Sequence, residues 1–130
     1  MNERERELGY KVIELFEDFL ESELNDSFVD VVFSKRHGFI LLIGYIREDN
    51  SFNDALAFEN ANDLFEQLIN EYEMACYFKW QQESGQEIDE DSLSEEQKNE
   101  LQMKIDYYTS KWQDICEESK KAKSIQEVNQ

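Results

Sequence analysis

The chain has 130 residues, 40% of them hydrophobic, and carries 31 acidic against 13 basic side chains, which gives a formal net charge of −18. This length and apolar content fit a single domain, residues 1–130, with one core. A domain that binds nucleic acid presents a basic stripe to the phosphates, and because this sequence shows none, its charge argues against direct binding of DNA or RNA.

The first predicted element is a helix from Asn2 to about Leu24, where apolar residues recur at helical spacing. Asn25, Asp26 and Ser27 supply the stop signal. The opposite side of this helix is acidic, and the carboxylates on or near its solvent face are Glu7, Glu14, Glu17, Asp18 and Glu21.

A three-stranded antiparallel meander is predicted next, with strands at residues 28–35, 39–46 and 55–58. Gly38 suits the first turn because it can adopt positive φ, and residues 47–54 form the second turn. The middle strand, 39–46, is apolar on both faces, so we expect helices to cover it on both sides.

The second predicted helix is capped by Asn60 or Asp63 and ends near Gly85, the residue type expected just beyond a helix. Residues 86–93 form an acidic linker, the segment we expect to be the most flexible.

A third helix is predicted from Ser94, which forms a capping box with Gln97, to about Lys123. Because the linker is short, this helix folds back on the second as an antiparallel hairpin. Residues 124–130 are polar and form a tail expected to fray. The fold class is therefore α+β, and because sheet and hairpin share the same apolar residues, we expect a monomer.

Cys76 and Cys116 are the only cysteines and lack the CxxC spacing of a redox or metal motif. The chain starts with charged residues and shows no secretory segment, so the sequence predicts a cytoplasmic protein, with no membrane association and with buried free thiols.

No catalytic or metal motif is recognisable. His37 is the only histidine, and the sequence places no nucleophile beside it. The stretch from Asp89 to Glu100 has the length of a calcium loop, but Leu93 occupies a ligand position and Ser94 stands where the loop needs glycine. The sequence therefore predicts no enzyme, no cofactor and no metal site.

The acidic residues are unevenly distributed, with ten acids and one base in residues 59–93 but four acids and three bases in residues 27–58. Carboxylates three or four positions apart on a helix stand about 5–6 Å from each other, close to the phosphate repeat of a nucleic acid. An ordinary solvated helix face is the better explanation of any single row, so the prediction of a binding role depends on the sum over several elements. The candidate partner-binding residues are Glu14, Glu17, Asp18, Glu21, Asp63, Glu66, Glu73, Glu87, Asp89, Glu90 and Asp91.

This element order, combined with strong acidity and no active-site motif, resembles some small phage-encoded anti-CRISPR proteins. The resemblance covers architecture and charge over the whole chain, without a shared residue motif. It implies a non-enzymatic inhibitor that occupies the nucleic-acid-binding surface of a basic protein such as a CRISPR nuclease.

Two other functions stay open at this point. An immunity protein or antitoxin that neutralises a basic toxin would carry the same charge. A small-molecule binder or enzyme would instead use a pocket between the sheet and the helical hairpin, with convergent polar groups.

Overall fold

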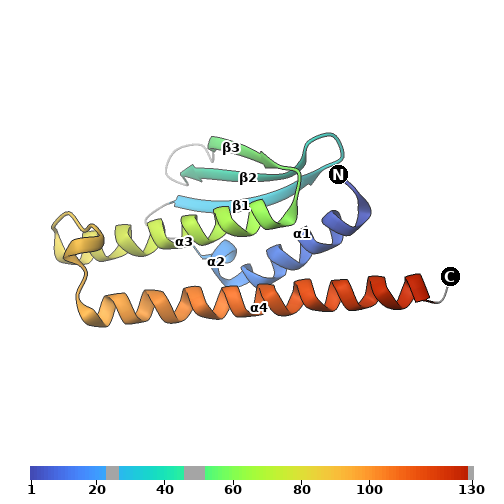
Figure 1. The fold of residues 1–130 in the computed structure, drawn as a ribbon. Coiled ribbons are helices and arrows are strands. Elements are labelled where there is room, and N and C mark those ends of the chain that lie inside the picture. Colours follow the sequence, from blue (N-terminus) through green and yellow to red (C-terminus); the bar gives the residue numbers. More distant parts are fainter. Residues whose placement is uncertain (23–26, 46–51, 129–130) are drawn as a thin grey trace.

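The computed structural model describes residues 1–22, 27–45 and 52–128, and it confirms the α+β fold (Figure 1). A sheet lies on a layer of helices, and one long helix runs along the side away from the sheet. The elements are α1 (Glu3–Leu15), α2 (Glu17–Glu21), β1 (Ser27–Ser34), β2 (Gly38–Tyr45), β3 (Phe52–Phe58), α3 (Ala61–Ser84), a 3-10 helix η1 (Glu90–Ser92) and α4 (Glu95–Val128).

The predicted first helix is interrupted at Phe16. The side chain of Asn2 caps α1 by accepting a hydrogen bond from the backbone N–H of Glu5 at 2.8 Å. Phe16, at φ −97° and ψ 14°, leaves helical geometry, and α2 then ends at Glu21. The predicted end at Leu24 falls outside the described residues.

The strands form one antiparallel sheet in the order β1-β2-β3. Gly38 has φ 81°, as its place at the end of the first turn requires. The third strand begins at Phe52 rather than at Ala55, so the last residues of the predicted second turn belong to β3. Residues 47–51 of that turn lie outside the described part of the chain.

The helices cover one face of the sheet, so the prediction of cover on both faces is wrong. Phe39 and Leu41 on the inner face are buried against the helices. On the outer face Val32 is 42% exposed, and Ile40 and Leu42 are partly exposed. An antiparallel sheet can leave one face in water, because its connections are short turns and need no helix on that side.

The two long helices form the predicted antiparallel hairpin. Asn60, not Asp63, caps α3: its side chain accepts a hydrogen bond from the backbone N–H of Asp63 at 2.9 Å. Gly85 ends the helix in the left-handed conformation, at φ 70°. Ser94 and Gln97 form the predicted capping box of α4, which extends to Val128, beyond the predicted end near Lys123.

The core centres on α1, which lies between α3 and α4 (Figure 1). The ring of Phe16 stacks on Tyr108 of α4, with ring centroids 4.2 Å apart, and also contacts Phe65 of α3 at 5.8 Å. Phe65 in turn stacks on Trp112, whose indole N–H donates a hydrogen bond to Asn62 Oδ1 at 3.2 Å. Phe16, Phe65, Tyr108 and Trp112 thus form one connected cluster that joins the three helices.

Candidate functional site

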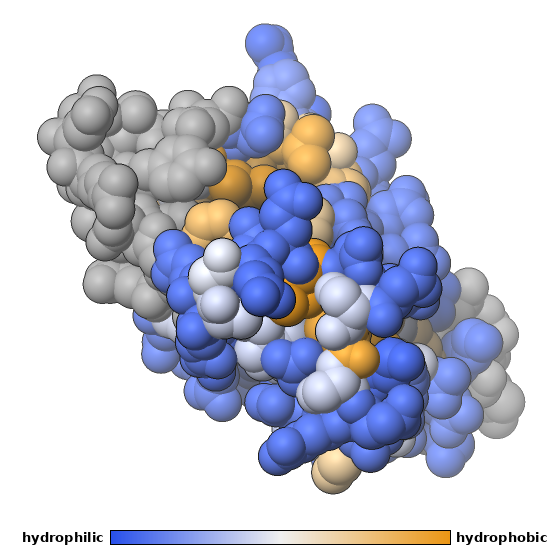
Figure 2. Space-filling model, turned by 90° about the vertical axis from the view of Figure 1, so that its left-hand side faces the viewer, coloured by the Kyte–Doolittle hydropathy of each residue, from blue (hydrophilic) through white to orange (hydrophobic). Residues whose placement is uncertain are grey.

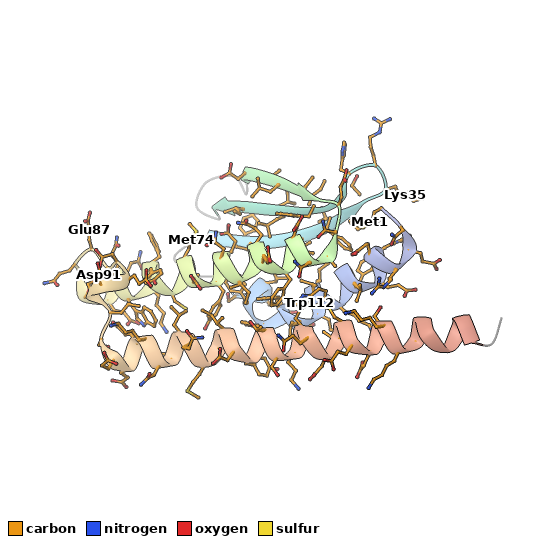
Figure 3. All side chains as sticks on the ribbon, viewed as in Figure 1. Met1, Lys35, Met74, Glu87, Asp91 and Trp112 are labelled. Atoms are coloured by element: carbon orange, nitrogen blue, oxygen red, sulfur yellow. The ribbon has the colours of Figure 1, made fainter. Side chains whose placement is uncertain are left out.

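The strongest concentration of charge lies where α3 and α4 are joined. Residues 80–97 contain seven acids and no lysine or arginine, and all seven acids are exposed. We name these residues the acidic tip: Glu83, Glu87, Asp89, Glu90, Asp91, Glu95 and Glu96. Figure 3 shows Glu87 and Asp91 at this end of the molecule and Lys35, in the turn between β1 and β2, at the opposite end.

The acidic tip is an ordered piece of backbone. Asp89 and Ser92 form a reciprocal capping box, in which each side chain accepts a hydrogen bond from the other residue's backbone N–H, at 2.9 and 2.8 Å. Leu93 is buried and packs with Trp80 and Leu101. The segment expected to be the most flexible is therefore anchored by local hydrogen bonds and by one buried side chain.

The surface of this end is mostly hydrophilic, as Figure 2 shows. Of the seven carboxylates only that of Glu95 has a described ion-pair partner, Lys98, at 3.7 Å. Such an exposed pair contributes little to stability. The acidic tip therefore presents a largely uncompensated negative surface on an ordered scaffold.

A pocket of about 250 Å³ lies behind the acidic tip, between α2, α3 and α4. Four of its eleven lining residues are aromatic, and one of these, Trp80, also packs against Leu93 of the tip segment. The lining residues are Asp18, Phe19 and Ser22 from α2 and the residue after it, Tyr72, Ala75, Cys76, Lys79 and Trp80 from α3, and Glu100, Lys104 and Tyr108 from α4.

The polar groups deep in this pocket are uncharged. Burial raises the pKa of Tyr72, and the neighbouring thiol of Cys76 raises it further. Burial also raises the pKa of the Cys76 thiol, although the neighbouring hydroxyl of Tyr72 acts in the opposite direction there. Burial and the charge of Asp18 raise the pKa of Tyr108 to about 12. At neutral pH all three groups are therefore protonated.

These shifts predict a loss of stability in alkali. An unfolded tyrosine loses its proton near pH 10, whereas Tyr108 in the folded chain keeps it to about pH 12. Between these values the unfolded state binds fewer protons, so the free energy of unfolding falls as pH rises; below about pH 10 the shift has no effect. Urea unfolding at about pH 9 and about pH 11 measures this fall. In Tyr108→Phe the free energy of unfolding should fall less between these two pH values. An identical fall in both proteins would contradict the raised pKa of Tyr108.

Two residues of the predicted acidic row on the first helix line separate concave surfaces. Asp18 lines the pocket behind the acidic tip. Glu14 lines a separate groove between α1 and α4, together with Lys11 and Lys111. Glu17 and Glu21 are exposed and line neither of these two surfaces. The break at Phe16 separates Glu14 from the three acids that follow it.

The predicted acids of α3 are also spread out. Asp63 and Glu66 lie near the start of the helix, where each accepts a hydrogen bond from a nearby asparagine side chain, at 2.9 and 3.3 Å. At 1.5 Å per residue, Asp63 is about 30 Å along the helix from the acidic tip. Glu73 is partly buried in the middle of α3. Only the predicted residues 87–91 lie together in the acidic tip, in which Glu83, Glu95 and Glu96 join them.

Sequence reasoning missed the α4 side of the pocket. Glu100, Lys104 and Tyr108 are four residues apart, a spacing that places them on one helix face. On α3, Tyr72, Cys76 and Trp80 repeat at the same spacing. These two rows were the available signal, but they indicate a pocket only once α2 is known to pack beside them.

The residues that the structure describes contain no group of three or more His, Cys, Asp or Glu side chains that could hold a metal ion. His37 is exposed in the turn between β1 and β2. Cys76 and Cys116 are free, partly buried thiols. None of the helices in the described ranges is both long and apolar enough to span a membrane.

The fold defines an α+β protein with an open sheet, and its described surface combines an acidic tip with a small aromatic pocket. No protein-family model matches the chain, and neither the curated proteins nor the solved structures give a significant match to it.

Proposed function

We propose that this protein is a non-enzymatic acidic inhibitor that binds a basic, nucleic-acid-binding protein surface and competes there with nucleic acid. One observation carries the proposal. Seven exposed carboxylates with no lysine or arginine among them occupy one end of the molecule, on an ordered scaffold.

The charge distribution gives this binding a physical mechanism. A net charge of −18 attracts a basic partner over a distance and raises the association rate, and salt weakens that attraction. Because capping bonds and the buried Leu93 already hold the acidic tip, little conformational entropy is lost when it docks.

The partner we propose is a nucleic-acid-binding enzyme of the CRISPR nuclease type, as the architecture and charge suggested. An immunity protein or antitoxin would use the same tip against a basic toxin. The partner distinguishes the two: the first function requires that DNA or RNA compete with this protein for one surface, and the second requires a toxin whose activity the protein suppresses.

The experiment is capture from host lysate by the immobilised protein at low salt, followed by elution at high salt and identification by mass. The affinity of the purified partner is then measured as salt is raised, with and without the nucleic acid that it binds. We expect affinity to fall steeply with salt and nucleic acid to compete. A complex whose affinity does not respond to salt would overturn the proposal.

A pair of matched variants locates the binding surface. Glu87→Gln with Asp91→Asn removes two charges from the acidic tip, and Asp54→Asn with Glu59→Gln removes the same two residue types from the sheet side. We expect the tip variant to weaken the complex about tenfold and the control to change it by less than about twofold. Equal losses in both would show that only the overall charge matters and that the tip is not the docking surface.

A further inference from the structure

We infer that the pocket between α2, α3 and α4 receives an arginine side chain of the basic partner. This inference rests on the proposed function and names the residue that enters beside the acidic tip. The pocket adjoins the tip through Trp80, which lines the pocket and packs against Leu93.

The walls of the pocket suit a planar cation. Phe19, Tyr72 and Tyr108 form a continuous aromatic wall, in which the ring of Tyr72 meets those of Phe19 and Tyr108 edge to face at 5.6 and 5.5 Å. Aromatic faces attract guanidinium and ammonium groups. A volume of about 250 Å³ leaves room for one side chain rather than for a peptide segment.

The chain already places one cation against this wall. The ammonium nitrogen of Lys104 lies 5.1 Å from the ring centroid of Tyr108 and 5.2 Å from that of Tyr107. Both distances fall within the range of cation–π attraction. The Tyr108 ring of this wall can therefore hold a cation, and an incoming side chain would compete with Lys104 for that ring.

The charged groups at the pocket are two carboxylates, Asp18 and Glu100, and two lysines, Lys79 and Lys104. These four local charges sum to zero. The net charge of the whole chain, −18, therefore determines the electrostatic potential at the pocket and favours a cation there. Arginine fits better than lysine because its guanidinium stacks on rings, binds carboxylates through two parallel bonds and is less strongly hydrated.

The test uses Nα-acetyl-arginine amide as the probe and the intact protein. The indole N–H signals of Trp80 and Trp112 are followed by NMR, with Trp80→Phe to assign them. We expect the probe to move the Trp80 signal and not that of Trp112, with an affinity in the millimolar range expected of a single side chain. Nα-acetyl-citrulline amide, which has nearly the same shape and no charge, should leave both signals in place.

Variants show which groups hold the probe. Glu100→Gln should weaken its binding about threefold, whereas Glu117→Gln, an exposed α4 residue that does not line the pocket, should not change it. Lys104→Gln should strengthen binding about twofold, because it removes the competing cation. An unmoved Trp80 signal, an equal response to the citrulline probe, or weaker binding by Lys104→Gln would each overturn the inference.

The two proposals fail separately. If the probe does not bind, the arginine pocket is wrong, and salt-dependent docking of the acidic tip still stands. If the partner complex proves independent of salt, the proposed function is wrong, whatever the probe does. Weaker partner binding by Glu100→Gln, with Glu117→Gln unaffected, would place a partner cation in the pocket; equal binding by both would exclude it.

Discussion

Phe16→Ala is expected to lower the free energy of unfolding by about 4 kcal/mol, the usual cost of truncating a fully buried phenylalanine. The Phe16 side chain is 0% exposed and contacts the rings of Tyr108 and Phe65, so its removal opens a cavity where α1, α3 and α4 meet. These neighbouring rings are stiff, which limits how far the site can collapse to fill the space.

Chemical denaturation followed by circular dichroism measures this loss. Met103→Ala is the control, because Met103 is 74% exposed on α4 and its truncation should cost less than about 0.5 kcal/mol. Phe16→Leu keeps most of the apolar volume and gives a smaller, measurable loss if the alanine variant does not fold. Similar stabilities for Phe16→Ala and Met103→Ala would contradict the packing of α1 between the other two helices.

Gly9→Ala is expected to destabilise the protein by about 2 kcal/mol, although it replaces a poor helix former with the best one. Alanine at a helical glycine normally gains about 1 kcal/mol. Here a Cβ at Gly9 would overlap the ring of Phe39, which is itself fully buried in the sheet. Such overpacking costs about 3 kcal/mol, so the steric term exceeds the gain in helix propensity.

A double-mutant cycle separates the steric cost of Gly9→Ala from its gain in helix propensity. Phe39→Leu shortens the side chain that blocks Gly9, so Gly9→Ala should cost much less in that background than in the parent chain. The measurement is again the free energy of unfolding for all four proteins. An increase in stability for Gly9→Ala alone would show that α1 does not approach β2 as closely as the structure has it.

The fold was predictable where local signals and the hydrophobic pattern agreed. Gly85 and the capping box of Ser94 and Gln97 marked the ends of the hairpin helices, and the structure has both features. The break at Phe16 carried no such signal, because the apolar spacing continues through it. The uncovered sheet face was missed because a run such as Ile40–Leu42 is apolar whether a helix lies over it or not.

The candidate site could also be predicted only in part. The acidic tip could be predicted in large part, since residues 87–91 are contiguous in the sequence. The pocket could not be predicted, because Asp18 and Glu100 are far apart in the sequence. They line one pocket only through the packing of three helices. That Glu14 and Asp18 of the predicted row line different surfaces was not predictable either, because both surfaces form only when α4 packs against the first two helices.

The position of α1 sets the order in which this protein can acquire its structure during synthesis. α1 is made before the two helices between which it packs, and Arg4 donates a hydrogen bond to Ser119 in the C-terminal half of α4, at 3.2 Å. The ring of Phe16 therefore has no Tyr108 to stack on until α4 has left the ribosome. Folding of this domain is thus tied to the synthesis of α4, and a chain that stops before α4 would expose the aromatic residues of α1 and α2 to chaperones and proteases.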